Sequence, residues 1–515
     1  MNKTTTRIFT LSCLLSLSLG SQAQRLTDKG TYLYSDATQL WRLTENAAGL
    51  SADSARKRGI AAVDYNHHNG NLHRVQEGGM SNDLTFFTES YQRLSRLFYG
   101  YGRFSFNTGR THDRAWSDVR RSYNSDPYFS GSAVKGKYDR QDIDLTAALG
   151  TCNFGPWRFG VRLDYRVGDL SRLRDPRSRS QMLQYQITPA ITFSFGNNAI
   201  GLAGHYNRYK EKIPNIQTVQ TDASLMYYTM TGMENALGIT NGYNAFQREW
   251  VNHKFGAELS YAYKNSNVYS LSRFTIDRGN EDIYGQYKYE PGHYRQYIFS
   301  FSTLNRIKAG RFIHEADFGA GYEQAYADEY RQELETTTNP ETGLNSYHYA
   351  TLLTFKKRYQ VNVLNLNLRY RLDITDGEAL RGYIGADGAL ATTRNKYLLH
   401  TSRFKYEYMD WSVNGGYGFM KGRLWAEAKA GLHTSLKNEL ALYDATTDYA
   451  VNVLIPDQDY YGANWWTGHV QLTYQFPLTI KKTHAMWFIK AYGDYAHTNN
   501  HLHASTIGVS LGLCY

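Results

Sequence analysis

The stretch Thr506 to Tyr515, TIGVSLGLCY, decides the fold of this chain. Successive side chains of a β-strand point to opposite faces, so one face of this stretch is apolar and the other is small and polar. An apolar outer face that ends on an aromatic residue is typical of the strand that closes a transmembrane β-barrel. We predict a C-terminal assembly signal formed by Ile507, Leu511, Leu513 and Tyr515.

The same alternation of apolar and polar residues recurs along most of the chain and predicts an all-β, antiparallel transmembrane barrel. We expect about 18 strands, near residues 59–76, 84–91, 95–107, 138–150, 157–168, 184–196, 199–210, 251–263, 268–277, 293–305, 311–324, 357–372, 380–394, 404–419, 423–433, 466–476, 484–496 and 501–515. If one of the first two packs inside the barrel, the alternative is 16. The connections alternate between short and mostly long, which places the short turns in the periplasm and the long loops outside the cell.

The chain begins with the features of a cleavable signal peptide, residues 1–23. Lys3 and Arg7 precede a short apolar run, and Ser21 to Ala23 forms a small-x-small cleavage site. The predicted barrel spans 59–515, and residues 24–58 are a periplasmic or plug-like segment. Within that segment Glu45 to Leu50 (ENAAGL) resembles the Asn-Pro-Ala hatch of fatty-acid-transporter-type barrels, with Ala47 in place of the proline.

Composition excludes several classes of protein. No apolar run is long enough for a membrane helix, and the mean hydropathy of -0.57 fits a barrel in which only alternate residues meet lipid. The chain carries a formal charge of +10, spread along strands and loops rather than clustered, so we expect no nucleic-acid partner. Cys152 and Cys514 are too few for a disulfide framework, and their strands lie too far apart to be bridged.

The best candidates for function are polar side chains on the inward faces of three strands. They are the predicted pore-lining residues Arg158, Arg162, Asp164, Arg166, Asn365, Asn367, Arg369, Arg371, Glu427 and Lys429. Arginine binds carboxylates and phosphates through a planar fork, so this set could steer anionic solutes, with Arg172, Arg174, Arg177 and Arg179 extending it into a loop. In the alternative, the arginines pair with lumen carboxylates such as Asp142, Asp144, Asp164, Asp387 and Glu427.

Other constellations give no chemistry. His497, His501 and His503 crowd one outer turn without a further ligand set, so we expect no metal and no cofactor. Asp457 and Asp459 are expected in a solvated loop, although they could meet a divalent cation that bridges lipid phosphates. We find no hydrolase, metalloprotease or nucleotide-binding motif and expect no enzyme; a catalytic site at the barrel rim is the less favoured alternative.

Two segments resemble a known family. Phe87 to Leu94 (FTESYQRL) and Tyr165 to Ser180 (YRVGDLSRLRDPRSRS) look like an uncharacterised family of Gram-negative outer-membrane β-barrels of about this length. The resemblance implies the fold and the location, and it transfers no functional residue.

Together these features predict an outer-membrane barrel that is a passive channel or transporter for small hydrophilic solutes, anions among them, narrowed by loops such as 211–250 folding inward. The alternative is a surface interaction or assembly barrel with a blocked lumen, which binds a partner or glycan through its outer loops. Expected partners are membrane lipid, lipopolysaccharide and, through the last strand, the barrel-assembly machinery.

Overall fold

The computed structural model describes residues 41, 44–52, 57–121, 125–218, 225–239, 246–377, 379–480 and 483–514. The predicted signal peptide, residues 24–40 and the terminal Tyr515 lie outside the described residues.

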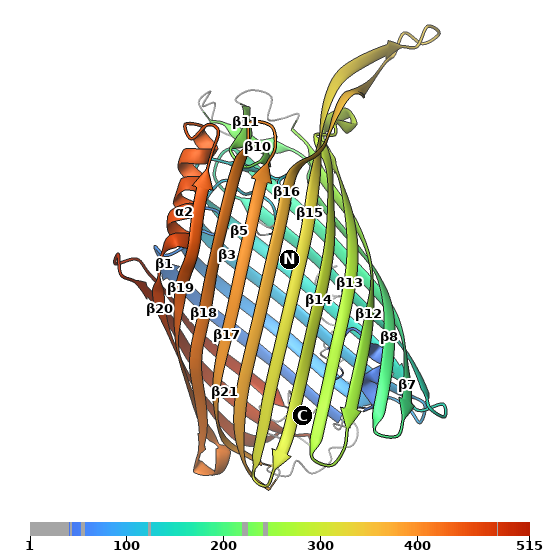
Figure 1. The fold of residues 1–515 in the computed structure, drawn as a ribbon, viewed down its shortest axis with the longest axis vertical. Coiled ribbons are helices and arrows are strands. Elements are labelled where there is room, and N and C mark those ends of the chain that lie inside the picture. Colours follow the sequence, from blue (N-terminus) through green and yellow to red (C-terminus); the bar gives the residue numbers. More distant parts are fainter. Residues whose placement is uncertain are drawn as a thin grey trace.

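Eighteen antiparallel strands form one closed barrel (Figure 1). Each pairs with the next along the chain, and the last pairs with the first, so that Ile60 lies opposite Cys514. The barrel strands are β1 (Lys57–Gly70), β2 (Met80–Arg93), β3 (Phe98–Arg114), β5 (Gly136–Thr151), β6 (Trp157–Arg172), β7 (Arg177–Phe195), β8 (Asn198–Ile213), β12 (Arg248–Lys264), β13 (Val268–Tyr284), β14 (Gly292–Ala309), β15 (Phe312–Thr338), β16 (Asn345–Asp376), β17 (Ala379–Tyr397), β18 (Ser402–Phe419), β19 (Leu424–Ala441), β20 (Trp465–Ile480), β21 (Thr483–Thr498) and β22 (His503–Cys514). The prediction of 18 strands is confirmed, and the alternative of 16 is wrong.

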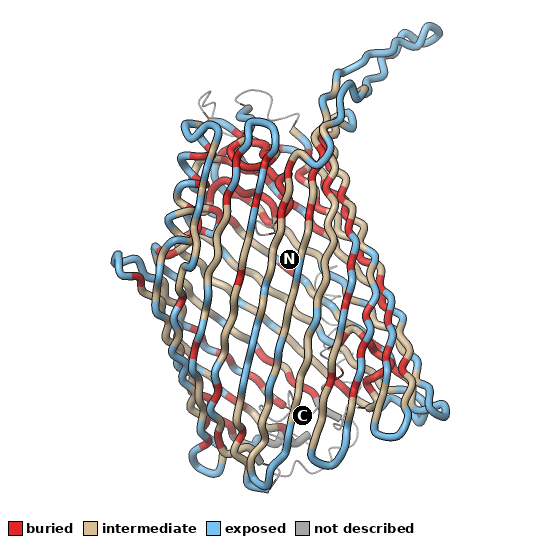
Figure 2. The backbone as a smooth tube through the Cα atoms, in the orientation of Figure 1, coloured by how far each residue is buried: buried red, intermediate tan, exposed pale blue. Residues whose placement is uncertain are grey.

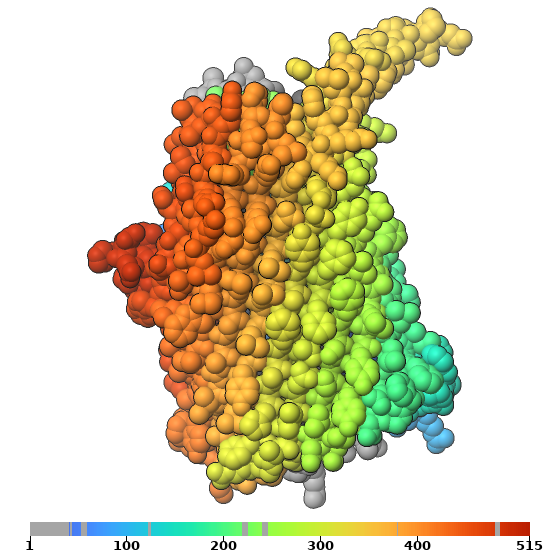
Figure 3. All heavy atoms as spheres, in the orientation of Figure 1, coloured from blue at the N-terminus to red at the C-terminus, as the bar shows by residue number. Residues whose placement is uncertain are grey.

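The last strand has the two faces that its sequence predicts. Val509 and Leu511 are 50% and 48% exposed on the outside of the barrel, whereas Ser510 between them is buried inside. Exposed apolar residues alternate in the same way on other strands, for example Trp157, Phe159, Val161, Leu163 and Tyr165 of β6, and Figure 3 shows the closely packed outer surface of one side of the wall. The alternation therefore follows from contact with lipid on one side and a polar lumen on the other.

Several strands extend beyond their predicted ends, and the longest extensions lie at the long-loop end of the barrel. The largest extension joins β15 and β16, which form a ribbon that projects far past the rim (Figure 1). The sequence predicts a loop over residues 325–356, between the strands expected at 311–324 and 357–372. The ladder continues through them with register shifts at Ala327/Glu329 and Arg331/Gln332. Beyond the membrane no lipid contacts the strands, so their outward side chains need not be apolar. The backbone hydrogen bonds between β15 and β16 therefore continue where apolar and polar residues no longer alternate.

Three long loops fold into the barrel at the same end, and we call their described residues the cap: 115–121, 125–135, 214–218, 225–239, 246–247 and 442–464. The cap contains a small sheet of β4 (Ser130–Ser132), β10 (Tyr227–Gly232) and β11 (Asn235–Ile239), paired in the order β11-β10-β4. Its third loop carries a π-helix (Ala450–Leu454) that runs into α2 (Ile455–Gly462). Figure 2 shows the buried residues concentrated at this end of the barrel.

The remaining helices are short 3-10 turns at Ala47–Ala52, Gln286–Lys288 and Met420–Gly422; β9 is Ile216–Gln217. Among the described residues, no helix is both long and apolar enough to cross a membrane. Cys152 and Cys514 are not joined by a disulfide, in agreement with the prediction.

Candidate binding compartment in the barrel lumen

The cap is held by an aromatic core that fills the lumen at the long-loop end. Trp116 lies 4.5 Å from the ring of Tyr228 and 5.6 Å from that of Tyr449, so all three cap loops meet there. Trp250 of β12 is fully buried against them and donates a hydrogen bond of 2.6 Å to the carbonyl of Tyr128. Buried residues from the eight consecutive barrel strands β8 to β18 join the same cluster, which ties the cap to nearly half of the wall.

Buried ion pairs fix the cap at its margins. Arg121 lies 2.9 Å from Glu281 of β13 and 3.2 Å from Asp126. Arg74, in the β1–β2 loop, lies 2.8 Å from Asp457 of α2. Breaking such a pair strands a charge away from water, so each pair holds its loop inward. The expectation that Asp457 belongs to a solvated loop is therefore wrong, because Asp457 is buried; Asp459 is exposed.

A second element enters the lumen near the short-turn end. Residues 41 and 44–52, which we call the plug segment, lie against β5, β6 and β7. Glycines of the wall make room for it: a Cβ at Gly150 or Gly160 would come within 2.4 Å of its backbone. Trp41 is buried against Ala262 and Leu271. The plug segment thus sits in a groove shaped by small residues.

Glu45 anchors the plug segment electrostatically. Its carboxylate accepts a 2.9 Å hydrogen bond from Gln186 and lies 3.1 Å from Nδ1 of His205. The neighbouring Thr44 carbonyl accepts a hydrogen bond from Arg162. Burial opposes the charge on Glu45, but the hydrogen bond with His205 and the attraction of His205 and Arg162 outweigh it, so the pKa of Glu45 is lowered.

We expect acid to release the plug segment. A carboxyl group with a lowered pKa stabilises the docked state above its ordinary value of 4.5, and this contribution is lost as the pH falls through the docked value. Hydrogen exchange of residues 44–52 should therefore accelerate below about pH 4.5. Glu45→Gln should show faster exchange already at pH 7 and lose the pH dependence. The exposed Glu335→Gln is the control, and an unchanged profile in Glu45→Gln would contradict the role of Glu45.

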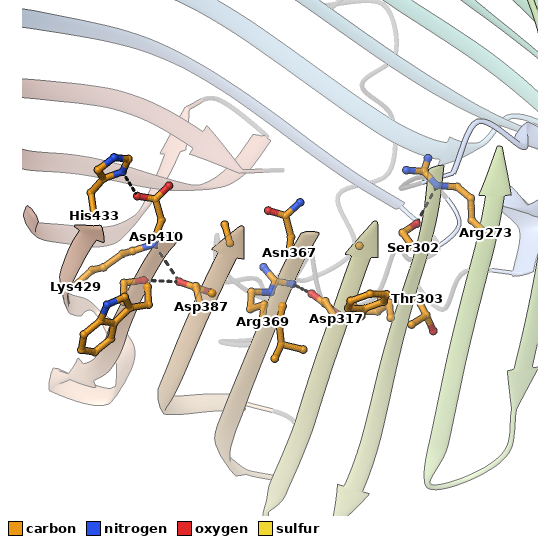
Figure 4. A pocket seen from close by; sticks show the side chains of 18 of the residues that line it. Arg273, Ser302, Thr303, Asp317, Asn367, Arg369, Asp387, Asp410, Lys429 and His433 are labelled. Carbon is orange, nitrogen blue, oxygen red and sulfur yellow. Dashed lines mark hydrogen bonds and ion pairs between the residues drawn. The ribbon is translucent and has the colours of Figure 1, made fainter. Parts of the chain in front are cut away.

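Between the cap and the short-turn end the lumen contains a cavity of about 600 Å³ lined by Thr44 and by strands β13 to β20. Figure 4 shows polar side chains that project into it from successive strands. They are Arg273, Ser302, Asp317, Asn367, Arg369, Asp387, Asp410, Ser412, Lys429, His433 and Thr467. A second hollow of about 240 Å³ adjoins it and shares Arg369, Asp387 and Lys429. Both signs of charge therefore alternate around one compartment.

Most of these charges are paired across strands. Lys429 lies 3.0 Å from Asp387, and Arg369 lies 3.0 Å from Glu315 and closer still to Asp317. Such pairs leave little net field, but their partly exposed groups still offer donors and acceptors to a solute.

His433 differs from the other charged groups of the compartment because only one of its two ring nitrogens has a partner among the described residues. Its Nδ1 lies 2.6 Å from a carboxylate oxygen of Asp410, and its ring stacks on Trp465 at 3.5 Å. The other ring nitrogen, Nε2, is buried and has no hydrogen-bond partner among the described residues.

The ten predicted pore-lining residues all lie on inward-facing positions, but in two separate groups. Arg158, Arg162, Asp164 and Arg166 are on β6, whereas Asn365, Asn367, Arg369, Arg371, Glu427 and Lys429 are on β16 and β19. Six strands lie between β6 and β16. Only Asn367, Arg369 and Lys429 line the main cavity, and Arg371 and Glu427 line the adjoining hollow. Asn365 lines neither.

The arginines on β6 are largely engaged. Arg162 lies 2.8 Å from Asp164, and Arg166 pairs with Asp144. Arg158 has no carboxylate partner among the described residues and instead donates to Asn153 and to the hydroxyl of Ser194, at 2.7 and 2.6 Å. The alternative in which these arginines pair with lumen carboxylates therefore holds for Arg162 and Arg166 but not for Arg158.

The arginines expected to continue this series into a loop do not do so. Arg172 is buried at the end of β6 and donates to Val134 and Tyr138 under the cap. Arg177 and Arg179 lie on the outward face of β7 and pair with Asp175 and Asp169. The reason is that β6 and β7 extend through the predicted loop, so alternation turns odd-numbered residues away from the lumen. Arg174 lies in the exposed turn between them.

No group of three or more metal-binding side chains occurs among the described residues. His497 and His501 lie near each other, with ring centroids 6.1 Å apart, and His503 begins β22.

Comparison with known proteins identifies a family without an assigned activity. The family model described as "Family of unknown function (DUF6850)" matches residues 47–515. A search of curated proteins gives no match. Similar solved structures include the copper transporter OprC, with 10% identity over 89% of this chain and 81% of that one and a TM-score of 0.38.

Two further structures are similar to the same extent. OpdK from Pseudomonas aeruginosa has 11% identity over 89% of this chain and 99% of that one, with a TM-score of 0.35. The transporter YddB from Escherichia coli has 7% identity over 88% and 80%, with a TM-score of 0.36. Similarities at this level do not bear on substrate or activity.

Proposed function

We propose that this chain, which belongs to the DUF6850 family, is a gated outer-membrane channel for small hydrophilic solutes. The observation that carries the proposal is the charged cavity of about 600 Å³ in the middle of the lumen. An 18-stranded barrel is wide enough for an aqueous channel, and here the cap and the plug segment narrow it at opposite ends. In this function the cavity is the compartment that a solute occupies during passage. No residue is assigned a catalytic role.

The charges of the compartment favour weak ion selectivity. Arg369, Lys429 and Arg273 face Asp317, Asp387 and Asp410, so cations and anions are balanced. Arg158 adds a positive charge near the short-turn end without a carboxylate partner, which favours a modest preference for anions. Neutral and zwitterionic solutes meet both donors and acceptors in the cavity.

We infer export through the signal peptide 1–23 into the outer membrane of a Gram-negative bacterium, with the short turns in the periplasm and the cap outside the cell. The last strand, with Ile507, Leu511, Leu513 and Tyr515, is the segment proposed to engage the barrel-assembly machinery. Lipid and lipopolysaccharide surround the wall.

Planar-bilayer recordings test the channel. The double variant Arg369→Gln/Lys429→Gln removes two cations from the cavity and leaves Asp317 and Asp387 without their partners. Its reversal potential in a salt gradient should move toward that of cations, because the remaining carboxylates attract them. Lys405→Gln removes an outward-facing cation from the same side of the barrel and is the control.

Conductance that ignores the double variant would place the cavity outside the permeation path. Protein that never conducts and never releases a trapped solute from liposomes would exclude the channel.

One observation favours a second function, the binding of a surface partner. The ribbon of β15 and β16 projects beyond the rim and exposes apolar side chains, with Leu344 at 70% and Leu352 at 56%. Tyr347 also stands against Tyr287, with ring centroids 5.2 Å apart. Exposed apolar and aromatic residues on a projecting element are typical of an interaction site. Loss of cell-surface binding, with normal conductance, after removal of the ribbon would support this function.

A further inference from the structure

The outer wall carries a group of cations that the proposed channel does not use. Arg208 and Lys212 lie on β8 and Arg278 lies on β13, all toward the long-loop end. We call these three residues the outer basic patch.

The register of the strands places the patch on the outside of the barrel. Arg208 stands opposite Tyr185 of β7 and His253 of β12, and Arg278 stands opposite Phe255 and Tyr297. Phe255 is 59% exposed on the outer face. Adjacent strands are about 4.8 Å apart, so the backbones of β8 and β13 are about 10 Å apart, within reach of one another's long side chains.

An apolar wall begins directly on the short-turn side of the patch. From two residues beyond Tyr206 and Phe255 toward the short turns, the outward positions of these strands carry no charge. The exposed apolar side chains of this part of the wall include Leu202, Leu259, Phe274 and Ile276. The tyrosines Tyr185, Tyr206 and Tyr297 lie among the cations. Aromatic residues with basic neighbours mark the level at which lipid headgroups meet hydrocarbon in membrane barrels.

The three cations have no carboxylate partner among the described residues, although carboxylates lie nearby. Those carboxylates are occupied by other groups: Glu249 by Lys210 at 2.8 Å, and Asp282 by His293 at 2.8 Å.

We propose that the outer basic patch binds the phosphates of a bisphosphorylated glycolipid, the lipid A portion of lipopolysaccharide, in the outer leaflet. The guanidinium groups of Arg208 and Arg278 fork onto phosphate oxygens, and Lys212 contributes a further point charge. The acyl chains of the same molecule lie along the apolar wall below. The spacing of two strands suits a headgroup with two phosphates. A soluble anion would use only the cations, whereas a lipid uses both the cations and the wall.

Native mass spectrometry of the purified barrel tests the site with three probes: bisphosphorylated lipid A, its fully dephosphorylated form, and phosphatidylglycerol. Lipid A should bind most tightly. The triple variant Arg208→Gln/Lys212→Gln/Arg278→Gln should weaken its binding by about fivefold for each cation removed, the effect of roughly 1 kcal/mol per basic residue at a lipid surface. The dephosphorylated form should bind weakly and equally to the parent and the variant.

The matched control is Arg394→Gln/Lys405→Gln/Lys437→Gln, three cations on another part of the wall that already have partners in Glu407 and Glu439. It should retain binding, and heat-modifiable migration on gels confirms that both triple variants are folded. An equal loss in the control would reduce the effect to general charge attraction and overturn the site. Equal affinity for phosphatidylglycerol would overturn the assignment to a bisphosphorylated lipid.

Discussion

Excision of the cap loop 214–247 should raise the single-channel conductance severalfold. Ile213 and Arg248 are directly paired, so a two-residue turn can join β8 to β12 without disturbing the barrel. The excision removes β10 and β11, including the fully buried Tyr227, from the centre of the cap. Because an 18-stranded barrel is wide enough to conduct once its lumen is free, ion flow should increase.

The control for this excision removes a shorter segment that does not enter the lumen. Tyr330 is paired with Thr354, so residues 331–353 of the projecting ribbon can also be replaced by a two-residue turn. That variant should conduct like the parent. If the cap excision gave a folded barrel with the parent's conductance, the cap would not be the barrier to flow.

A charged residue on the lipid-facing wall should have the largest effect on stability. Val470 is 62% exposed and lies between Trp466 and Tyr474, which mark the two aromatic edges on β20. Val470→Arg places a cation near the middle of the hydrocarbon layer and should destabilise the barrel by about 2 to 4 kcal/mol. Denaturant titration of the protein folded into lipid vesicles measures this change.

The neighbouring residue is the control, because it has the same strand position but the opposite face. Gln471 points into the lumen and donates a hydrogen bond to Glu427. Gln471→Arg keeps a donor beside that carboxylate, so the free energy of unfolding should change little. Equal destabilisation by both substitutions would mean that the faces of β20 are assigned incorrectly.

The barrel itself could be predicted from sequence because lipid imposes a period of two on every strand that crosses the membrane. For β22 the pattern predicts the outward Ile507 and Val509, which are exposed as expected. The same reasoning fails where lipid ends. The cap has no fixed period: Trp116 and Tyr228 come from two different loops, and nothing in their spacing along the chain indicates the contact.

The site was predicted only in part for a related reason. Alternation places Lys429 on the inner face, but its partner Asp387 lies two strands away, and that contact depends on register. The pair Arg162 and Asp164 is closer to the sequence, because residues two apart on one strand share a face. His433 and Asp410, which complete the compartment, are directly paired on β18 and β19 in the register set by the short turn between Phe419 and Leu424. Alternation alone does not fix that register, because the exact residues of the turn have to be known first.

The plug segment also has a mechanical consequence. Only four residues, 53–56, separate its last residue from β1, so the gap between Ala52 and Lys57 is at most about 18 Å. β1 is one side of the seam that closes the barrel, whereas the plug segment is docked on β5 to β7. The plug segment therefore connects β1, at the closing seam, to β5, β6 and β7 through the lumen. If the segment were released, β1 would lose this internal connection, and only the hydrogen bonds between strands would maintain the cross-section of the barrel.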